Sequence, residues 1–367
     1  MLFQKLMGKG PASMISPSAP KTLWAWGQNN SGQLGLGDAA NRSSPVQVGA
    51  LATWSQIARS SHSLAVKTDG TLWAWGSNFR GKLGLGDAAN RSSPVQVGAL
   101  ATWSQVAGTT GLSLAIKTDG TLWAWGKADD GALGLGDTVY RSSPVQVGTL
   151  TTWSQIASSP SHTLAIKTDS TLWVWGLHND GRIGLGDTVY RSSPTQVGTL
   201  ATWSQVAGGD AHSLAVKTDG TLWACGINSK GRLGLGDIVS RSSPVQVGTL
   251  ANWSQIATSS HSLAIKTDGT LWAWGTNDNN GQLGLGDAVS RSSPVQVGAL
   301  ATWSQVAAAA HSLALKTDGT LWSWGANNTG QLGDTVYRSS PAQVGTLATW
   351  TTIAKGSESN QSLAIRV

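Results

Sequence analysis

The chain contains 367 residues, of which 12% are charged and 40% are hydrophobic, and its formal net charge is +6. Its 20 tryptophans provide enough apolar surface for a core, which excludes a disordered chain. The single cysteine excludes a disulfide scaffold and a multi-cysteine zinc site, and no apolar run approaches the roughly 18 residues of a membrane-spanning helix, so we expect no membrane span.

Residues 1–20 precede the repeated pattern and form a predicted N-terminal tail or arm. Lys5 is not followed by an apolar stretch of roughly 7–15 residues, so we predict no secretory signal and synthesis in the cytoplasm. Three explanations stay open for this segment: a non-native leader, a disordered tail, or an arm that anchors the ring to a partner.

Residues 21–367 consist of seven copies of one unit. The string Thr-Leu-Trp recurs at intervals of 49 or 50 residues, beginning at Thr22, Thr71, Thr121, Thr171, Thr221, Thr270 and Thr320. A second string, Trp-Ser-Gln, recurs in six copies and becomes Trp350-Thr-Thr in the seventh. Cys225 occupies a tryptophan position of the fifth unit, so we interpret it as a core residue. Fixed periods of this length are typical of solenoids and propellers.

The pattern within one unit predicts four short strands. Residues 63–68 and 71–76 have strand-like composition, and Asp69-Gly70 between them is a hairpin signal. A glycine-rich connection over residues 81–87 leads to a strand at residues 91–97, and residues 103–107 supply the fourth strand. Four strands in each of seven units predict an all-β, seven-bladed β-propeller with four-stranded blades.

The two ends of the repeat distinguish a closed ring from an open solenoid. The run Gln361–Val367 stops where the Asp-Gly turn is expected, and residues 21–27 supply the missing half of that hairpin. An open solenoid would leave both half-units with unpaired strand edges, which proteins normally avoid. We therefore predict a ring closed by pairing of the N- and C-terminal strands in one composite blade.

The unit resembles the regulator of chromosome condensation repeat family. The matching residues are His62-Ser-Leu-Ala, Asp69-Gly70, Leu72-Trp-Ala-Trp-Gly76 and, most literally, Asn29-Asn-Ser-Gly-Gln-Leu-Gly35. The resemblance covers residues 21–367 and implies a seven-bladed propeller, which agrees with the period and the split unit. The near-identical copies also resemble the highly repetitive bacterial and phage members of this family, which implies a particle or surface component.

The two edges of the predicted ring differ in how much they vary between units. Because neighbouring strands are antiparallel, the loops before His62 and after Gly76 share one edge, the first rim, and the Asp-Gly turns share the other, the second rim. The first-rim loops vary while the strands do not; this variation is typical of a binding surface, and drift is the alternative. The candidate partner-binding residues are Arg59, Phe79, Arg80, Lys127, Asp129, Asp130, His178, Asp180, Asp210, Lys230, Asp278 and Glu358.

Other kinds of site receive little support. The basic residues outside the repeated motifs are scattered, so we do not expect nucleic acid binding. His62 and its counterparts recur one blade apart without carboxylates or cysteines at ligand spacing, so we expect no metal and no cofactor. We interpret these histidines as residues that hydrogen-bond local backbone, and Asp38 and its counterparts as turn residues. No catalytic constellation emerges, so we predict that the protein is not an enzyme.

We therefore predict a non-catalytic protein-binding or assembly propeller, in the form of a structural or surface component of a bacterial or phage particle. Its expected partners are proteins, including particle or surface proteins, and the sequence predicts no oligomeric state. The alternative is a soluble inhibitor or adaptor that binds an enzyme or another protein through rim loops. The resemblance also implies guanine-nucleotide exchange on a Ran-like GTPase, but no unit carries an insertion long enough for a projecting wedge.

Overall fold

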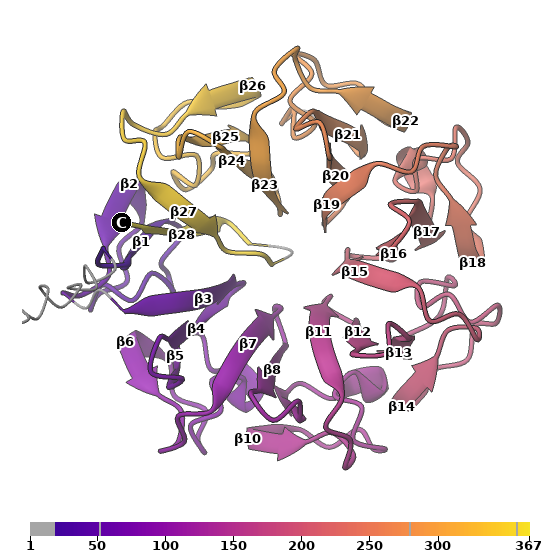
Figure 1. The fold of residues 1–367 in the computed structure, drawn as a ribbon. Coiled ribbons are helices and arrows are strands. Elements are labelled where there is room, and N and C mark those ends of the chain that lie inside the picture. The colour runs from indigo at the N-terminus through magenta and orange to yellow at the C-terminus, as the bar shows by residue number, and fades with distance from the viewer. Residues whose placement is uncertain (1–18, 51–52, 279, 357–358) are drawn as a thin grey trace, which may run out of the picture.

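The computed structural model describes residues 19–50, 53–278, 280–356 and 359–367. Most of the predicted N-terminal tail and the candidate residue Glu358 therefore lie outside the described residues. The described chain forms seven four-stranded sheets arranged as blades around a central axis (Figure 1). This arrangement confirms the predicted all-β, seven-bladed propeller.

The strands of each blade are given from the centre of the ring outward. Blade 1 contains β3 (Trp54–Arg59), β4 (His62–Lys67), β5 (Leu72–Gly76) and β6 (Arg91–Gln96). Blade 2 contains β7 (Trp103–Gly108), β8 (Leu112–Lys117), β9 (Leu122–Gly126) and β10 (Arg141–Gln146). Blade 3 contains β11 (Trp153–Ser158), β12 (His162–Lys167), β13 (Leu172–Gly176) and β14 (Arg191–Gln196). Blade 4 contains β15 (Trp203–Gly208), β16 (His212–Lys217), β17 (Leu222–Gly226) and β18 (Arg241–Gln246).

The remaining blades follow the same order. Blade 5 contains β19 (Trp253–Thr258), β20 (His261–Lys266), β21 (Leu271–Gly275) and β22 (Arg291–Gln296). Blade 6 contains β23 (Trp303–Ala308), β24 (His311–Lys316), β25 (Leu321–Gly325) and β26 (Arg338–Gln343). The composite blade contains β27 (Trp350–Ile353), β28 (Gln361–Arg366), β1 (Thr22–Gly27) and β2 (Arg42–Gln47). Short 3-10 turns occur at η1 (Phe79–Gly81), η2 (Asp129–Gly131) and η3 (Ser229–Gly231).

The composite blade joins the two ends of the described chain. β28 pairs with β1 along its full length, with Thr22 opposite Arg366 and Gly27 opposite Gln361. β27 pairs with β28 on the inner side, and β2 pairs with β1 on the outer side. The indigo and yellow strands that lie together in Figure 1 form this blade, and they confirm the predicted ring closure.

The second-rim turn is built by the Asp-Gly pair. In blade 1, the Asp69 carboxylate accepts hydrogen bonds from the backbone N–H of Thr71 at 2.9 Å and from its hydroxyl at 2.7 Å. Gly70 has a φ of +79°, and a Cβ there would lie 2.5 Å from the carbonyl oxygen of Ala101. Glycine therefore suits both the turn and the loop that packs against it, although blade 3 accommodates Ser170 at the equivalent position with a φ of +64°.

Tryptophans pack in a repeated cluster that fills the space between blades. The ring centroid of Trp54 lies 6.3 Å from that of Trp73 and 6.0 Å from that of Trp75. Trp75 is fully buried, and its Nε1 donates to the carbonyl oxygen of Gln33 in the composite blade at 3.0 Å. Trp73 is half-buried, and the Lys67 ammonium lies 3.6 Å from its ring centroid. The second tryptophan of each pair is thus a core residue, whereas the first covers the core with a lysine above it.

Cys225 takes the place of the fully buried tryptophan in blade 4. It is buried, and this burial raises the pKa of its thiol to about 12. Its Sγ lies 3.6 Å from the carbonyl oxygen of Arg182, the acceptor equivalent to the one that Trp75 uses. The interpretation of Cys225 as a core residue is confirmed.

The histidines of the repeat connect neighbouring blades. His62 Nε2 lies 2.7 Å from the hydroxyl of Ser113 in blade 2, and that hydroxyl donates to the carbonyl oxygen of Lys82 at 2.7 Å. Because the serine proton is used in this way, His62 Nε2 must carry the proton of the His62–Ser113 bond. The expectation that these histidines bond local backbone was therefore wrong: their partner is a side chain of the next blade.

The innermost strands surround a central cavity of about 550 Å³, lined by residues such as Gln105, Gln155 and Lys355. Gln105 Nε2 donates to the carbonyl oxygen of Ser154 in the next blade at 2.6 Å, so the cavity wall also ties blades together. None of the helices within the described ranges is long and apolar enough to cross a membrane.

Candidate functional site on the first rim

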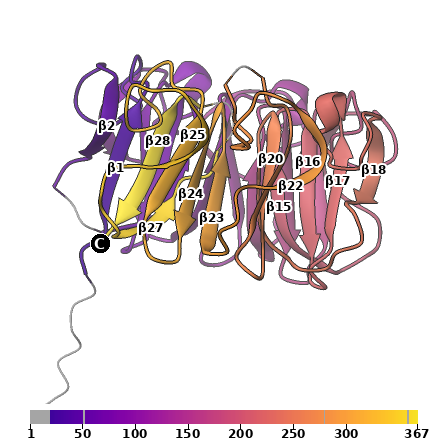
Figure 2. The same cartoon turned by 90° about the horizontal axis from the view of Figure 1, so that it is seen from above.

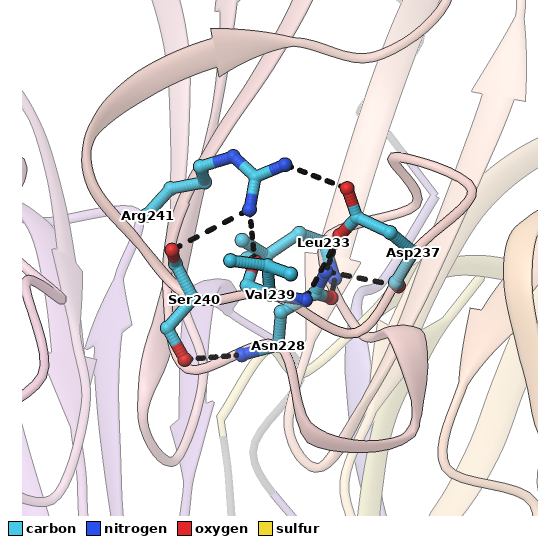
Figure 3. Close-up of polar contacts among 6 residues, drawn as sticks. All are labelled: Asn228, Leu233, Asp237, Val239, Ser240 and Arg241. Atoms are coloured by element: carbon cyan, nitrogen blue, oxygen red, sulfur yellow. Dashed lines mark hydrogen bonds and ion pairs between the residues drawn. The ribbon is translucent and has the colours of Figure 1, made fainter.

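A recurring set of buried polar contacts holds the first-rim loops, and Figure 3 shows it for blade 4. Asn228 donates from Nδ2 to the Asp237 carboxylate at 2.8 Å and accepts at Oδ1 from the backbone N–H of Leu233 at 2.9 Å. The other carboxylate oxygen of Asp237 pairs with Arg241 at 2.6 Å. Hydrogen bonds from the Val239 N–H, and then from Arg241, lower the pKa of Asp237. The loop backbone is thus fixed from within.

The sequence analysis found only part of this arrangement. The turn role of the aspartates is confirmed, but the asparagine and the arginine that bond them were not identified. The signal was present, because an asparagine follows the tryptophan-strand glycine by two residues in five units, at Asn29, Asn78, Asn228, Asn277 and Asn327. An Asp–Arg ion pair closes this loop in all seven blades, from Asp38–Arg42 to Asp334–Arg338.

Each loop also rests on the next blade. Gly231 has a φ of +76°, and a Cβ there would lie 2.2 Å from Cα of Ser292 at the start of β22. This close approach requires glycine, and it brings the tips of neighbouring loops close enough to interact. Variable side chains on this rim therefore lie on rigid supports at the upper edge of Figure 2, opposite the edge where the chain ends.

One cluster of candidate residues forms between blades 1 and 2, and we call it the platform: Phe79, Arg80, Lys127, Asp129 and Tyr140. Asp129 accepts from Arg80 Nη1 and pairs with Lys127 Nζ, both at 2.9 Å. The Tyr140 hydroxyl donates to its other oxygen at 2.5 Å. The Arg80 guanidinium carbon lies 4.9 Å from the ring centroid of Phe79 and 4.5 Å from that of Tyr140. Phe79 itself is 65% exposed.

Electrostatics hold the platform together. Burial works against ionisation of Asp129, but Tyr140, Lys127 and Arg80 outweigh it and lower the pKa of Asp129 to about 2. The same hydrogen bond from Tyr140 to Asp129 raises the pKa of the tyrosine. At neutral pH the platform therefore contains an ionised carboxylate, two cations and a neutral phenol.

A second group of candidates lies on blades 3 to 5. Asp180 pairs with Arg182 at 2.6 Å, and Arg182 also donates to the backbone carbonyl of Asp210 at 3.3 Å. The Asp210 carboxylate accepts from the Ser259 hydroxyl at 3.3 Å, and burial raises its pKa. Lys230 of blade 4 forms an ion pair with Asp278 of blade 5. These charged side chains connect first-rim loops to one another. The remaining candidate, Asp130, lies beside the platform and has a φ of +57°.

Two candidate residues are corrected by the structure, because their side chains are buried. Arg59 is 0% exposed and bonds the carbonyl oxygens of Ala354 and Gln361, so it helps to join blade 1 to the composite blade. Burial lowers the pKa of its guanidinium to about 9. His178 is also 0% exposed and replaces the loop asparagine: its Nδ1 accepts from the backbone N–H of Ile183 at 3.3 Å. Neither side chain is available to a partner in this structure.

Exposed apolar residues that the candidate set omitted extend along the first rim. The Asp-Ala-Ala-Asn sequence of blade 1 becomes Asp-Thr-Val-Tyr or a related sequence in blades 2 to 6. The large apolar side chains at these positions are 43–69% exposed, and we call them the apolar arc: Val139, Tyr140, Val189, Tyr190, Ile238, Val239, Val289, Val336 and Tyr337.

Within the described ranges, no group of three or more histidine, cysteine, aspartate or glutamate side chains is placed to hold a metal ion. The arrangement of the first rim instead offers aromatic rings, an arginine and apolar side chains on fixed loops. Among these, tyrosine and arginine are enriched at the energetic centres of protein interfaces.

Solved structures with the same fold come from yeast and human proteins. Prp20p from Saccharomyces cerevisiae, described with its binding to Gsp1p and histones, has a TM-score of 0.83 at 22% identity over 95% of this chain and 92% of that chain. Yeast Prp20 bound to Kap60 has a TM-score of 0.83 at 22% identity over 100% and 96% of the two chains. Human WBSCR16 has a TM-score of 0.83 at 21% identity over 94% and 98%.

The search of curated proteins found no match. The family model for the regulator of chromosome condensation (RCC1) repeat matches residues 22–66, 69–116, 119–166, 169–216, 219–265, 268–315 and 318–360. A second model with the same description matches residues 203–232. Seven consecutive matches span nearly the whole ring, and the chain therefore belongs to the regulator of chromosome condensation repeat family.

Proposed function

We propose that this protein is a non-catalytic, protein-binding propeller that recognises its partner through the first rim. The observation that carries this proposal is the difference between the two rims. On the second rim, the same leucine recurs from blade to blade at 45–53% exposure, at Leu100, Leu150, Leu200, Leu250, Leu300 and Leu347. On the first rim, exposed side chains change from alanine and asparagine to valine, isoleucine, tyrosine and phenylalanine around the ring.

This asymmetry matters because a partner without sevenfold symmetry needs different contacts at different blades. A surface that repeats one residue offers the same contact at each blade and cannot fix the orientation of such a partner. The platform and the apolar arc break the symmetry on loops that the Asn–Asp–Arg bonds hold in place. Rigid presentation lowers the entropy cost of binding.

The solved relatives support a protein as the partner. Prp20p is described as binding Gsp1p and histones, and Prp20 forms a complex with Kap60. By analogy of fold, which does not fix function by itself, we assign a protein partner to this chain. We further propose that the protein is a structural or surface component of a bacterial or phage particle. The near-identity of its seven units is the feature that supports this role.

Affinity capture with two matched sets of variants tests the proposal. The first-rim variant replaces residues by their counterparts in other blades: Phe79→Ser, Arg80→Lys, Val189→Ala, Tyr190→Asn, Val336→Ala and Tyr337→Asn. The second-rim variant carries Leu100→Ser, Leu200→Ser and Leu300→Ser. Captured proteins from extracts and purified particles of the source organism are identified by mass spectrometry, and their affinities are then measured with the purified proteins.

We expect the first-rim variant to lose its partner and the second-rim variant to retain it. Loss of the partner only in the second-rim variant would overturn the assignment of the binding face. Capture of particle proteins supports the assembly form, whereas capture of a soluble enzyme supports an inhibitor or adaptor. If a small GTPase is captured, release of labelled GDP from it on addition of the ring would show exchange activity and contradict a purely binding role.

A further inference from the structure

The platform differs from the matching region of blade 4 although the two backbones are alike. Phe79-Arg80-Gly81 in η1 and Ser229-Lys230-Gly231 in η3 both form a 3-10 turn, with φ values of 65° for Arg80 and 61° for Lys230. The loop therefore tolerates Ser-Lys as well as Phe-Arg. Because the fold does not require them, the exposed ring of Phe79 and the guanidinium beside it need another explanation.

The Arg80 guanidinium is held in place, but within the described residues only its Nη1 donates a hydrogen bond. Its Nη1 donates to Asp129 at 2.9 Å, and its plane is close to the rings of Phe79 and Tyr140. Its Nε and Nη2 make no hydrogen bond with any residue in the described part of the chain. These two nitrogens form the side of a guanidinium that binds a carboxylate through two parallel hydrogen bonds.

Asp129 is not available to a partner in the same way. Its two oxygens are occupied by the Tyr140 hydroxyl, by Arg80 and by Lys127. Arg80 and Lys127 share this single carboxylate, and Asp130 follows it in the chain. The platform therefore offers a partner the unoccupied Nε and Nη2 edge of Arg80 next to an exposed aromatic ring. A ligand that complements both features combines a carboxylate with an apolar side chain.

We propose that the platform binds an acidic–apolar segment of the partner protein, whose carboxylate accepts from Arg80 Nε and Nη2 while a neighbouring apolar side chain packs on Phe79. This inference rests on the proposed first-rim function and specifies the chemistry of the partner there. Because Asp129 and the rings of Phe79 and Tyr140 already hold Arg80 in place, a partner loses less entropy when it forms the two hydrogen bonds.

The test uses a displayed library of random linear peptides selected on the full-length protein. Enriched sequences are made as fluorescent peptides, and their affinities are measured by fluorescence anisotropy. Arg80→Lys keeps the charge but removes the two-nitrogen edge, and Phe79→Ser removes the ring; both residues occur at the matching positions of η3. Leu200→Ser and Leu300→Ser on the second rim serve as controls outside the first rim.

We expect enriched peptides to pair aspartate or glutamate with an aromatic or branched apolar residue. Each platform variant should weaken their binding by about tenfold or more, and the controls should leave it unchanged. Enrichment of basic peptides, failure to enrich any peptide, or equal affinity for Arg80→Lys and the unchanged protein would overturn the inference. If peptide binding depends on apolar-arc residues such as Val189, Tyr190 and Tyr337 but not on Phe79 or Arg80, the proposed function survives and this inference fails.

Discussion

The strands of the ring differ little in sequence from blade to blade, whereas the first-rim loops differ strongly. Apart from a few substitutions such as Cys225 and Leu112, the strands of different blades keep the same tryptophan, histidine and serine contacts, because these side chains pack against a neighbouring blade. The tips of the first-rim loops are exposed, and the same backbone carries Phe-Arg in η1 and Ser-Lys in η3. The comparison teaches that changes in the strands should alter stability, whereas changes at the loop tips should alter binding alone.

Opening the ring should have the largest effect on the free energy of unfolding. Deleting Gln361–Val367 removes β28, which pairs with β1 and β27 and buries Leu363 and Ile365 at 0–1% exposure. We expect the free energy of unfolding to fall by more than about 5 kcal/mol, since each lost core side chain alone costs about 2–5 kcal/mol. Chemical denaturation followed by tryptophan fluorescence measures the change. Val367→Ala is the control and should have little effect; an unchanged midpoint for the deletion would contradict ring closure.

Acid should weaken the strands through the buried histidines. Burial, the largest cause in each case, lowers the pKa of His62, His162, His212, His261 and His311, to about 3 for His162 and His261. The unfolded chain binds these protons below about pH 6.5 and the folded chain does not, so stability falls as the pH drops from 6.5 towards 3. Each histidine contributes a slope of about 1.4 kcal/mol per pH unit.

Leucine substitution tests this pH dependence directly. Blade 2 already has Leu112 in place of the histidine, so the fold accepts an apolar residue there. The histidine-to-leucine variants should unfold with a shallower pH dependence between pH 6.5 and 3, measured by denaturation at a series of pH values. The same slope in a variant that lacks several of these histidines would show that other groups control acid unfolding.

A smaller effect is expected where one blade lacks its tryptophan. Cys225→Trp restores the side chain that the other six blades have, facing Gly184 as Trp175 faces Gly134. We expect the free energy of unfolding to rise by about 1–2 kcal/mol, from added apolar burial and a hydrogen bond to the Arg182 carbonyl oxygen. Trp175→Cys is the reciprocal control and should destabilise the ring by about 3–5 kcal/mol. A loss of stability in Cys225→Trp would mean that blade 4 has repacked around the smaller residue.

The loop tips should give the smallest effect on folding. Phe79→Ser with Arg80→Lys converts η1 into the sequence of η3, so we expect a change in the free energy of unfolding within about 0.5 kcal/mol. Thermal and chemical denaturation of the double variant measure it. A loss well beyond this value would show that the platform joins blades 1 and 2 structurally, and the division between strands and loop tips would then be less sharp than described here.

Much of this fold could be predicted from the sequence because the residues that form each contact recur in up to seven copies of the unit. The period identified the units, and the half-units at Lys21 and Gln361 indicated the composite blade. The site was less predictable, because exposure depends on how blades meet. Arg59 occupies a position that varies between units, at the end of β3, yet its guanidinium is buried against the composite blade. The contact of Arg80 with Asp129 links residues 49 positions apart and leaves no local pattern.

The most direct test of the account is a ring in which the first-rim loops that follow Gly76 and its counterparts in blades 1 to 6 are replaced by residues 28–41 of the composite blade. Its unfolding midpoint and its binding to the captured partner are compared with those of the unchanged protein. The account predicts a ring of similar stability that no longer binds the partner. A symmetrised ring that still binds with unchanged affinity would contradict the assignment of recognition to the first rim.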